Sequence, residues 1–86
     1  MNTDILENSE RDFSVLVPLL EKKKADRVLR EVETYLLLIG HEGFYSSWSE
    51  DKKDGSWFTE FSFKFREGKP GLKKAIEFAL NLALKE

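Results

Sequence analysis

The segment 57–65 (WFTEFSFKF) constrains the fold more than any other stretch of the chain. Its odd-numbered residues are aromatic except for Thr59, and its even-numbered residues are polar except for Phe58. Because side chains alternate between the two faces of a strand, this pattern predicts a β-strand with one aromatic and one mostly polar face. A slip of one residue would exchange the faces, so we expect a single register against the neighbouring strands.

Two further strands are expected earlier in the chain. Residues 13–17 (FSVLV) are rich in β-branched side chains and alternate in polarity, and Pro18 suits the end or border of a strand because it lacks an amide donor. Residues 44–49 form the second expected strand. A turn over 51–55 separates it from the aromatic strand, since Asp54-Gly55 is a strong turn dipeptide.

Two helices complete the predicted elements. Apolar residues recur at three- and four-residue steps over 21–39, and Gly40 is suited to ending that helix. The second helix spans 72–84 and is apolar over most of its circumference, so we expect it to be covered on more than one side. We expect Phe61 and Phe63 of the aromatic strand to form the core with Val32 and Ile76 of the helices.

The predicted order is therefore β-α-β-β-α, a single α+β domain over residues 13–86 preceded by a flexible polar segment, 1–12. We expect a three-stranded mixed sheet in which the third strand lies between the first two (order 1-3-2), with both helices on one face. This is an incomplete ferredoxin-like two-layer sandwich that lacks the final strand. It leaves the first strand as an open edge, unless residues 1–12 fold back over it.

Composition excludes several classes of protein. Hydrophobic residues make up 41% and charged residues 35% of the 86 residues, which is typical of a globular domain. The longest apolar run, 36–39, is far shorter than the ~20 residues that span a bilayer, and residues 1–12 do not resemble a secretory signal. The chain has no cysteine, so it has no disulfide and no thiolate metal site. We expect a cytoplasmic protein with no membrane contact.

Catalytic chemistry finds little support in the sequence. His41 is the only histidine, and no group of ligands or acid-base partners is spaced around it. The serines of 44–49 lack the G-x-S-x-G context of a nucleophile, and the glycines of 68–71 do not have the spacing of a phosphate-binding loop. We therefore expect no enzyme activity, no cofactor and no metal site.

Surplus apolar residues indicate a protein–protein contact instead. Several of them fall outside the predicted core faces of the strands and helices, and a contiguous exposed apolar patch marks a contact surface. We predict a small non-catalytic interaction or regulatory module, an inhibitor or adaptor, that binds a protein partner, itself as a homodimer, or both. The candidate interface residues are Leu16, Leu37, Leu38, Phe58 and Leu84.

A basic run supports an alternative function, RNA or DNA binding. The chain has 14 Lys and Arg against 16 Asp and Glu, a net charge of −2. Residues 64–74 hold five basic residues against one acidic residue, a net +4, so the rest of the chain carries −6. Such asymmetry favours an anionic partner at this segment. The candidate anion-binding residues are Lys64, Arg66, Lys69, Lys73 and Lys74.

Two short segments resemble nucleic-acid-binding families. Residues 68–75 (GKPGLKKA) resemble the loop and helix start of double-stranded RNA-binding domains, where paired lysines occur. Residues 15–19 and 55–61 fall where RNA-recognition motifs have their two sheet motifs, but Leu16 and Ser56 replace two of the three stacking aromatics and only Phe58 remains. The order of the elements differs from that of double-stranded RNA-binding domains, and the stacking positions differ from those of RNA-recognition motifs. We therefore assign the chain to neither family.

Overall fold

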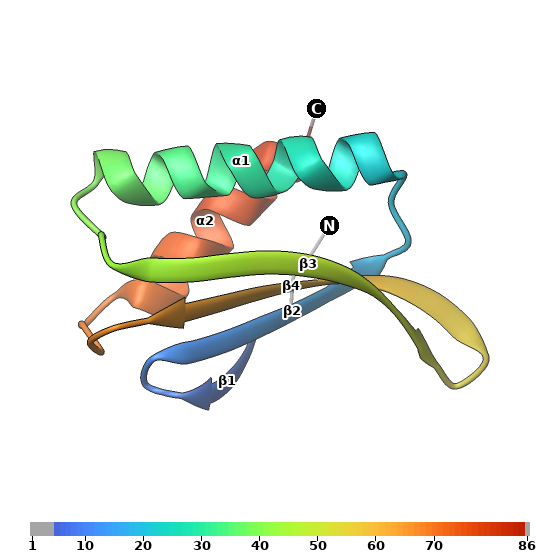
Figure 1. The fold of residues 1–86 in the computed structure, drawn as a ribbon, viewed down its shortest axis with the longest axis horizontal. Coiled ribbons are helices and arrows are strands. Elements are labelled where there is room, and N and C mark those ends of the chain that lie inside the picture. Colours follow the sequence, from blue (N-terminus) through green and yellow to red (C-terminus); the bar gives the residue numbers. More distant parts are fainter. Residues whose placement is uncertain (1–4, 86) are drawn as a thin grey trace.

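The computed structural model describes residues 5–85. In it the aromatic segment forms β4 (Ser56–Phe65), an inner strand of a four-stranded antiparallel sheet. Its neighbours are β2 (Asp12–Pro18) and β3 (Phe44–Lys53), and β1 (Ile5–Ser9) pairs with the other side of β2. The order across the sheet is β1-β2-β4-β3. The helices α1 (Lys22–Leu38) and α2 (Leu72–Leu84) lie on one face of this sheet (Figure 1).

The predicted three-stranded mixed sheet of order 1-3-2 is wrong. The sheet has a fourth strand, and all of its pairings are antiparallel, so the incomplete ferredoxin-like description does not hold. The additional strand is β1, which comes from the segment expected to be flexible. A hairpin returns the chain along β2, from Ile5 opposite Val15 to Ser9 opposite Asp12. The first strand of the prediction, now β2, is therefore paired on both sides over residues 12–15.

β1 was missed because little in its own sequence marks a strand. Only Ile5 of its five side chains is buried, and the turn that follows, Glu10-Arg11, contains none of the usual turn residues. The strand forms because β2 offers a row of backbone donors and acceptors that need partners. Tertiary pairing, and not local propensity, makes this segment extended.

The core lies between the helices and the aromatic face of the sheet. The four residues predicted to anchor it, Phe61, Phe63, Val32 and Ile76, are all fully buried. Phe61 lies in the middle of the sheet, opposite Val15 on one side and Trp48 on the other.

Thr59 is the one buried polar side chain among residues 5–85. Its hydroxyl accepts a hydrogen bond of 2.8 Å from the backbone amide of Leu20, in the connection between β2 and α1. This bond satisfies a partly buried donor and ties the start of the connection to the sheet.

The hairpin between β3 and β4 is tighter than the sequence suggested. Asp54 and Gly55 both have positive φ, 51° and 81°, as a two-residue type I′ turn requires. Lys53 pairs with Ser56 directly beside this turn, so the charged residues 51–53, which were predicted to lie in the turn, belong to β3. β3 is thereby ten residues long.

Candidate interaction surfaces

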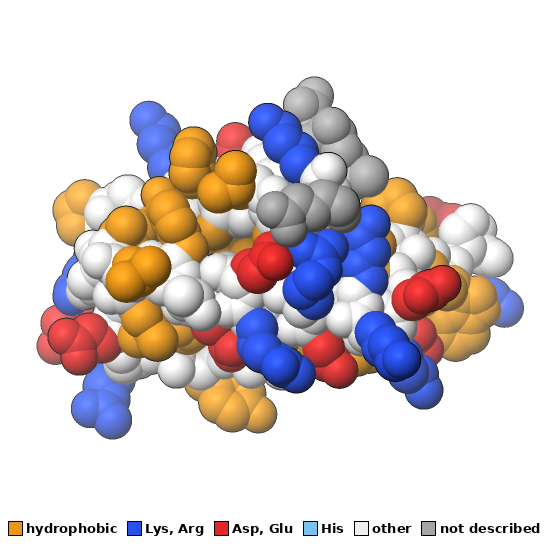
Figure 2. All heavy atoms as spheres, turned by 90° about the horizontal axis from the view of Figure 1, so that it is seen from above, with side chains coloured by type: hydrophobic (Ala, Val, Ile, Leu, Met, Phe, Trp, Pro, Cys, Tyr) orange, Lys and Arg blue, Asp and Glu red, His pale blue; other side chains and the backbone are white. Residues whose placement is uncertain are grey.

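The outer face of the helix layer carries a contiguous apolar surface, here called the helix-face patch, formed by Tyr35, Leu38, Phe78 and Leu82. The rings of Tyr35 and Phe78 join the two helices, with centroids 5.5 Å apart. Leu38 is 80% exposed, Phe78 56% and Leu82 53%. Seen from the helix side, apolar side chains gather over the carboxyl-terminal half of α1 and the adjacent α2 (Figure 2). The outer face of a surface helix is ordinarily polar, so this patch is unusual.

Basic side chains surround the helix-face patch. Lys74 lies one turn before Phe78 on α2, and Lys85 follows Leu82 by three residues. On α1, Arg30 lines the same shallow hollow of about 320 Å³ as Tyr35 and Leu38. The acidic residue in that hollow, Glu31, is paired with Arg27 at 3.0 Å. The margin of the patch is therefore positive.

The five predicted interface residues do not form one surface. Of these, Leu38 alone belongs to the helix-face patch. Glu33 marks the flank of α1 that faces β3, since its carboxylate accepts a hydrogen bond from the Ser46 hydroxyl of β3. Leu37 lies one turn after Glu33 and therefore on the same flank. Leu84 is half-buried and packs against the core.

The remaining two predicted interface residues, Leu16 and Phe58, are half-buried diagonal neighbours on the face of the sheet that the helices do not cover. Most of their neighbours on that face are polar, including Ser14, whose hydroxyl accepts a 2.8 Å hydrogen bond from the Asn8 side chain. The uncovered sheet face is therefore a polar surface with a small apolar pair, and not a broad apolar one.

Two carboxyl groups meet on this uncovered face. Burial raises the pKa of the Glu60 carboxyl above its ordinary value, and a hydrogen bond with the Asp51 carboxyl and the charge of that group raise it further. The two residues are diagonal neighbours, since Glu60 pairs with Ser49 and Asp51 with Phe58. Glu60 therefore retains its proton to higher pH than a free glutamate does.

The basic run is divided among several surfaces. Lys64 projects from the uncovered sheet face, and Arg66 lies beside His41 at a hollow of about 240 Å³. Lys69, Lys73 and Lys74 line another hollow, of about 580 Å³, at the start of α2, which we call the basic hollow.

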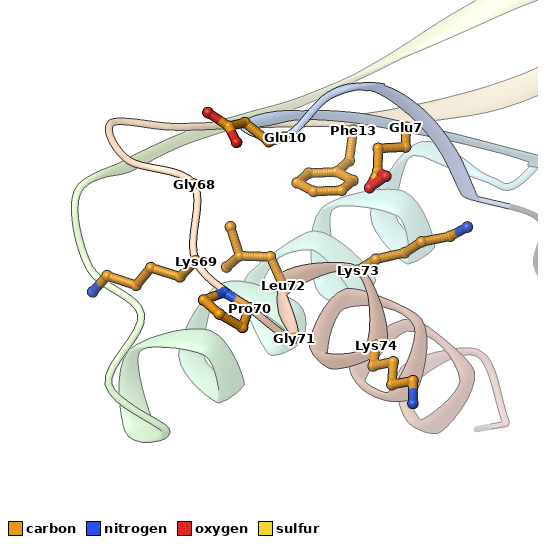
Figure 3. Close-up of a pocket in the computed structure, with 10 residues that line it drawn as sticks. All are labelled: Glu7, Glu10, Phe13, Gly68, Lys69, Pro70, Gly71, Leu72, Lys73 and Lys74. Atoms are coloured by element: carbon orange, nitrogen blue, oxygen red, sulfur yellow. The ribbon is translucent and has the colours of Figure 1, made fainter.

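The basic hollow also contains two acidic residues. Glu7 and Glu10 line it from β1 and the turn after β1, opposite the helix (Figure 3). The three lysine side chains point in different directions, and their ammonium groups lie away from one another (Figure 3). The two carboxylates offset much of the positive charge that the sequence assigned to this segment, because β1 was not expected to lie beside it.

His41 lies in the connection between α1 and β3. Its Nδ1 atom is buried and has no hydrogen-bond partner among residues 5–85. Glu42, Glu67 and Lys69 line the hollow beside it, and none of them is hydrogen-bonded to Nδ1. No three His, Cys, Asp or Glu side chains of the described residues are placed together to hold a metal ion. The same residues include no helix long and apolar enough to cross a membrane.

Two members of the helix-face patch, Phe78 and Leu82, were missed at the sequence level, because they were assigned to the broad apolar surface of the second helix. Tyr35 was assigned to the core face of the first helix, and it does pack, half-buried, against the core. A helical wheel places Phe78 and Leu82 more than 90° from the buried centre of α2, which Leu72, Ile76 and Ala83 define. That angular separation is the signal that could have identified them.

Comparisons with known proteins add no further information about the chain. No family model, curated protein or solved structure matches it.

Proposed function

We propose that this chain is a non-catalytic protein-interaction module whose outer helix face binds an amphipathic helix of a partner protein. The observation that carries the proposal is the helix-face patch, where four large apolar side chains from two helices meet at the surface. An apolar seam between two helices is suited to the apolar face of a third helix. That helix would contact the seam through apolar side chains spaced three and four residues apart.

The charges around the patch favour a partner with acidic margins. Arg30, Lys74 and Lys85 would lie close to the polar flanks of a helix seated on the patch, where Asp and Glu are complementary. The same charges disfavour a second copy of this patch as the occupant, because a two-fold axis would place like charges together.

The exposed area sets the expected strength of binding. Covering apolar surface contributes about 25 cal/mol per Å², whereas association itself costs about 4–15 kcal/mol. We therefore expect modest, reversible binding, as suits a regulatory adaptor or inhibitor. A cytoplasmic location stays part of this proposal, since a chain without cysteine has no need of an oxidising compartment.

A displayed library of random 16-residue helical peptides tests the proposal. We expect the selected peptides to carry apolar residues at positions i, i+3 or i+4, and i+7, with Asp or Glu beside them. Their affinity should fall at least tenfold for Leu38→Glu, which places a carboxylate in the contact. Leu6→Glu is the matched control, since Leu6 is 65% exposed on the uncovered sheet face. Selected peptides that bind Leu38→Glu as well as the parent would contradict the proposal.

Nucleic-acid binding is less favoured than a protein partner. The five basic residues of 64–74 face different surfaces, and Glu7 and Glu10 lie in the hollow that three of them line. A polyanion would have to approach these carboxylates as well as the lysines.

A further inference from the structure

The sheet has two edge strands, and they differ in how well they are protected. β1 is five residues long and irregular between Glu7 and Ser9. β3 is ten residues long and pairs with β4 without a register shift, from Phe44 opposite Phe65 to Lys53 opposite Ser56. Short length and bulges protect an edge, whereas a long regular strand offers a template for another strand. Residues 44–49 of β3 also contain no charge and no proline.

The outward hydrogen-bonding groups of β3 can be assigned to particular residues. The Gly43 carbonyl accepts a 2.9 Å hydrogen bond from the Arg66 amide, on the line of the β3–β4 register. Bonded and non-bonded pairs alternate in an antiparallel ladder, so the odd-numbered residues of β3 bond to β4. The backbone N–H and C=O groups of the even-numbered residues point outward: Phe44, Ser46, Trp48, Glu50 and Lys52.

We propose that β3 pairs antiparallel with β3 of a second copy of this chain, centred on Trp48, to form one continuous eight-stranded sheet. In this register Phe44 lies opposite Lys52, Ser46 opposite Glu50, and Trp48 opposite its own copy. All five outward residues of one copy then meet the five of the other. A shift by two residues in either direction leaves one of them unpaired in each copy.

The charges of β3 favour this orientation. Its charged residues lie in 50–53, and antiparallel pairing places Glu50, Asp51 and Lys52 opposite the uncharged half of the other copy. Parallel in-register pairing would instead place each charge opposite itself, which destabilises a sheet. The charges of β3 therefore favour antiparallel pairing of two copies of this strand and disfavour parallel pairing.

The helix layer supplies a second contact beside the paired edges. The flank of α1 that faces β3 carries Asp26, which accepts a 2.6 Å hydrogen bond from the Trp48 indole, and Glu33, which accepts from Ser46. Leu37 follows on this flank and is 56% exposed. A two-fold axis perpendicular to the sheet brings the same flank of the second copy alongside, with the Asp26–Trp48 pairs of the two copies nearest the axis. Both helix layers then lie on the same side of the joint sheet.

Single cysteines test the register directly, because the chain has none of its own. Odd-numbered residues form the non-bonded pairs of the proposed contact, with Cα atoms about 4.5 Å apart, which suits a disulfide. Ser47 then lies opposite Ser49 of the other copy. We expect an oxidised mixture of Ser47→Cys and Ser49→Cys to give more covalent dimer than either variant alone. Ser62→Cys, on the same face of the inner strand β4, is the control and should give none.

A proline variant separates edge pairing from folding. Glu50→Pro removes an N–H that points outward and leaves the bonds of β3 to β4 in place, which an edge strand tolerates. In sedimentation equilibrium we expect a micromolar dimer for the parent and for Glu50→Ala, and at least tenfold weaker association for Glu50→Pro with an unchanged circular dichroism spectrum. A parent that stays monomeric at 100 μM, or cysteine variants that cross-link equally alone and mixed, would overturn the proposal.

Discussion

Phe61 offers a direct test of how the aromatic strand faces the core. Its side chain is fully buried in the middle of the sheet, between Val15 on β2 and Trp48 on β3. Phe58 lies on the same strand but projects from the uncovered face, where it is half-buried. Truncating each to alanine therefore compares the two faces of one strand with the same chemical change.

The expected magnitudes differ severalfold. Truncating a buried phenylalanine to alanine costs about 3–5 kcal/mol, through lost burial and the cavity that remains. At about 0.05–0.15 kcal/mol per residue, a domain of 86 residues has a stability of roughly 4–13 kcal/mol. Phe61→Ala should therefore remove a large share of the stability. Phe58→Ala removes only a partly exposed ring, and we expect it to cost about 1 kcal/mol or less.

Urea unfolding followed by circular dichroism measures both free energies on one scale. The fluorescence of Trp48, which lies opposite Phe61, adds a local probe of the cavity. A larger loss for Phe58→Ala would show that the assigned faces of β4 are reversed, and equal losses would also refute the described core.

Three other predictions concern the buried hydroxyl, the carboxyl pair and the basic hollow. Thr59→Val should lower stability by about 1–3 kcal/mol in urea unfolding, since the Leu20 amide loses its acceptor, and a loss within error of zero would contradict this. Glu60→Gln should stabilise the protein at pH 7. The folded state holds the Glu60 proton more tightly than the unfolded state, so parental stability falls as pH rises through the raised pKa. The advantage of Glu60→Gln should vanish below pH 4, and an advantage that is independent of pH would exclude this cause. Changing the three lysines of the basic hollow to glutamate should abolish any salt-sensitive binding of the chain to RNA or DNA in a fluorescence titration. Retained binding would place the polyanion elsewhere.

Local sequence patterns were sufficient to predict β4, α1 and α2, because the apolar residues that determine each of these elements lie within it. The alternation of 57–65 predicted an inner strand with Phe61 and Phe63 buried, and the three- and four-residue spacing of 21–39 predicted α1. The second helix, predicted over 72–84, has those same bounds in α2. In each case the apolar side chains that stabilise the element lie within it.

Features that depend on a distant partner could not be predicted in the same way. β1 is extended because of β2, and its Glu7 and Glu10 enter the basic hollow only because the hairpin brings them there. The helix-face patch likewise depends on the packing of α1 against α2, which brings Tyr35 next to Phe78. Neighbouring positions also diverge, since Leu37 and Leu38 are adjacent in sequence but lie on different flanks of α1.

The β1–β2 hairpin has a consequence for the size of any assembly. A sheet that joins copies through both of its edges grows without limit, whereas a sheet with one usable edge stops at two copies. β1 is short and irregular and pairs with residues 12–15 of β2, so we expect each chain to have one usable edge, β3. A chain that begins at residue 10 would lack β1 and expose the edge of β2 as a second usable edge. Such a chain should polymerise into filaments, so β1 would limit the assembly to two copies.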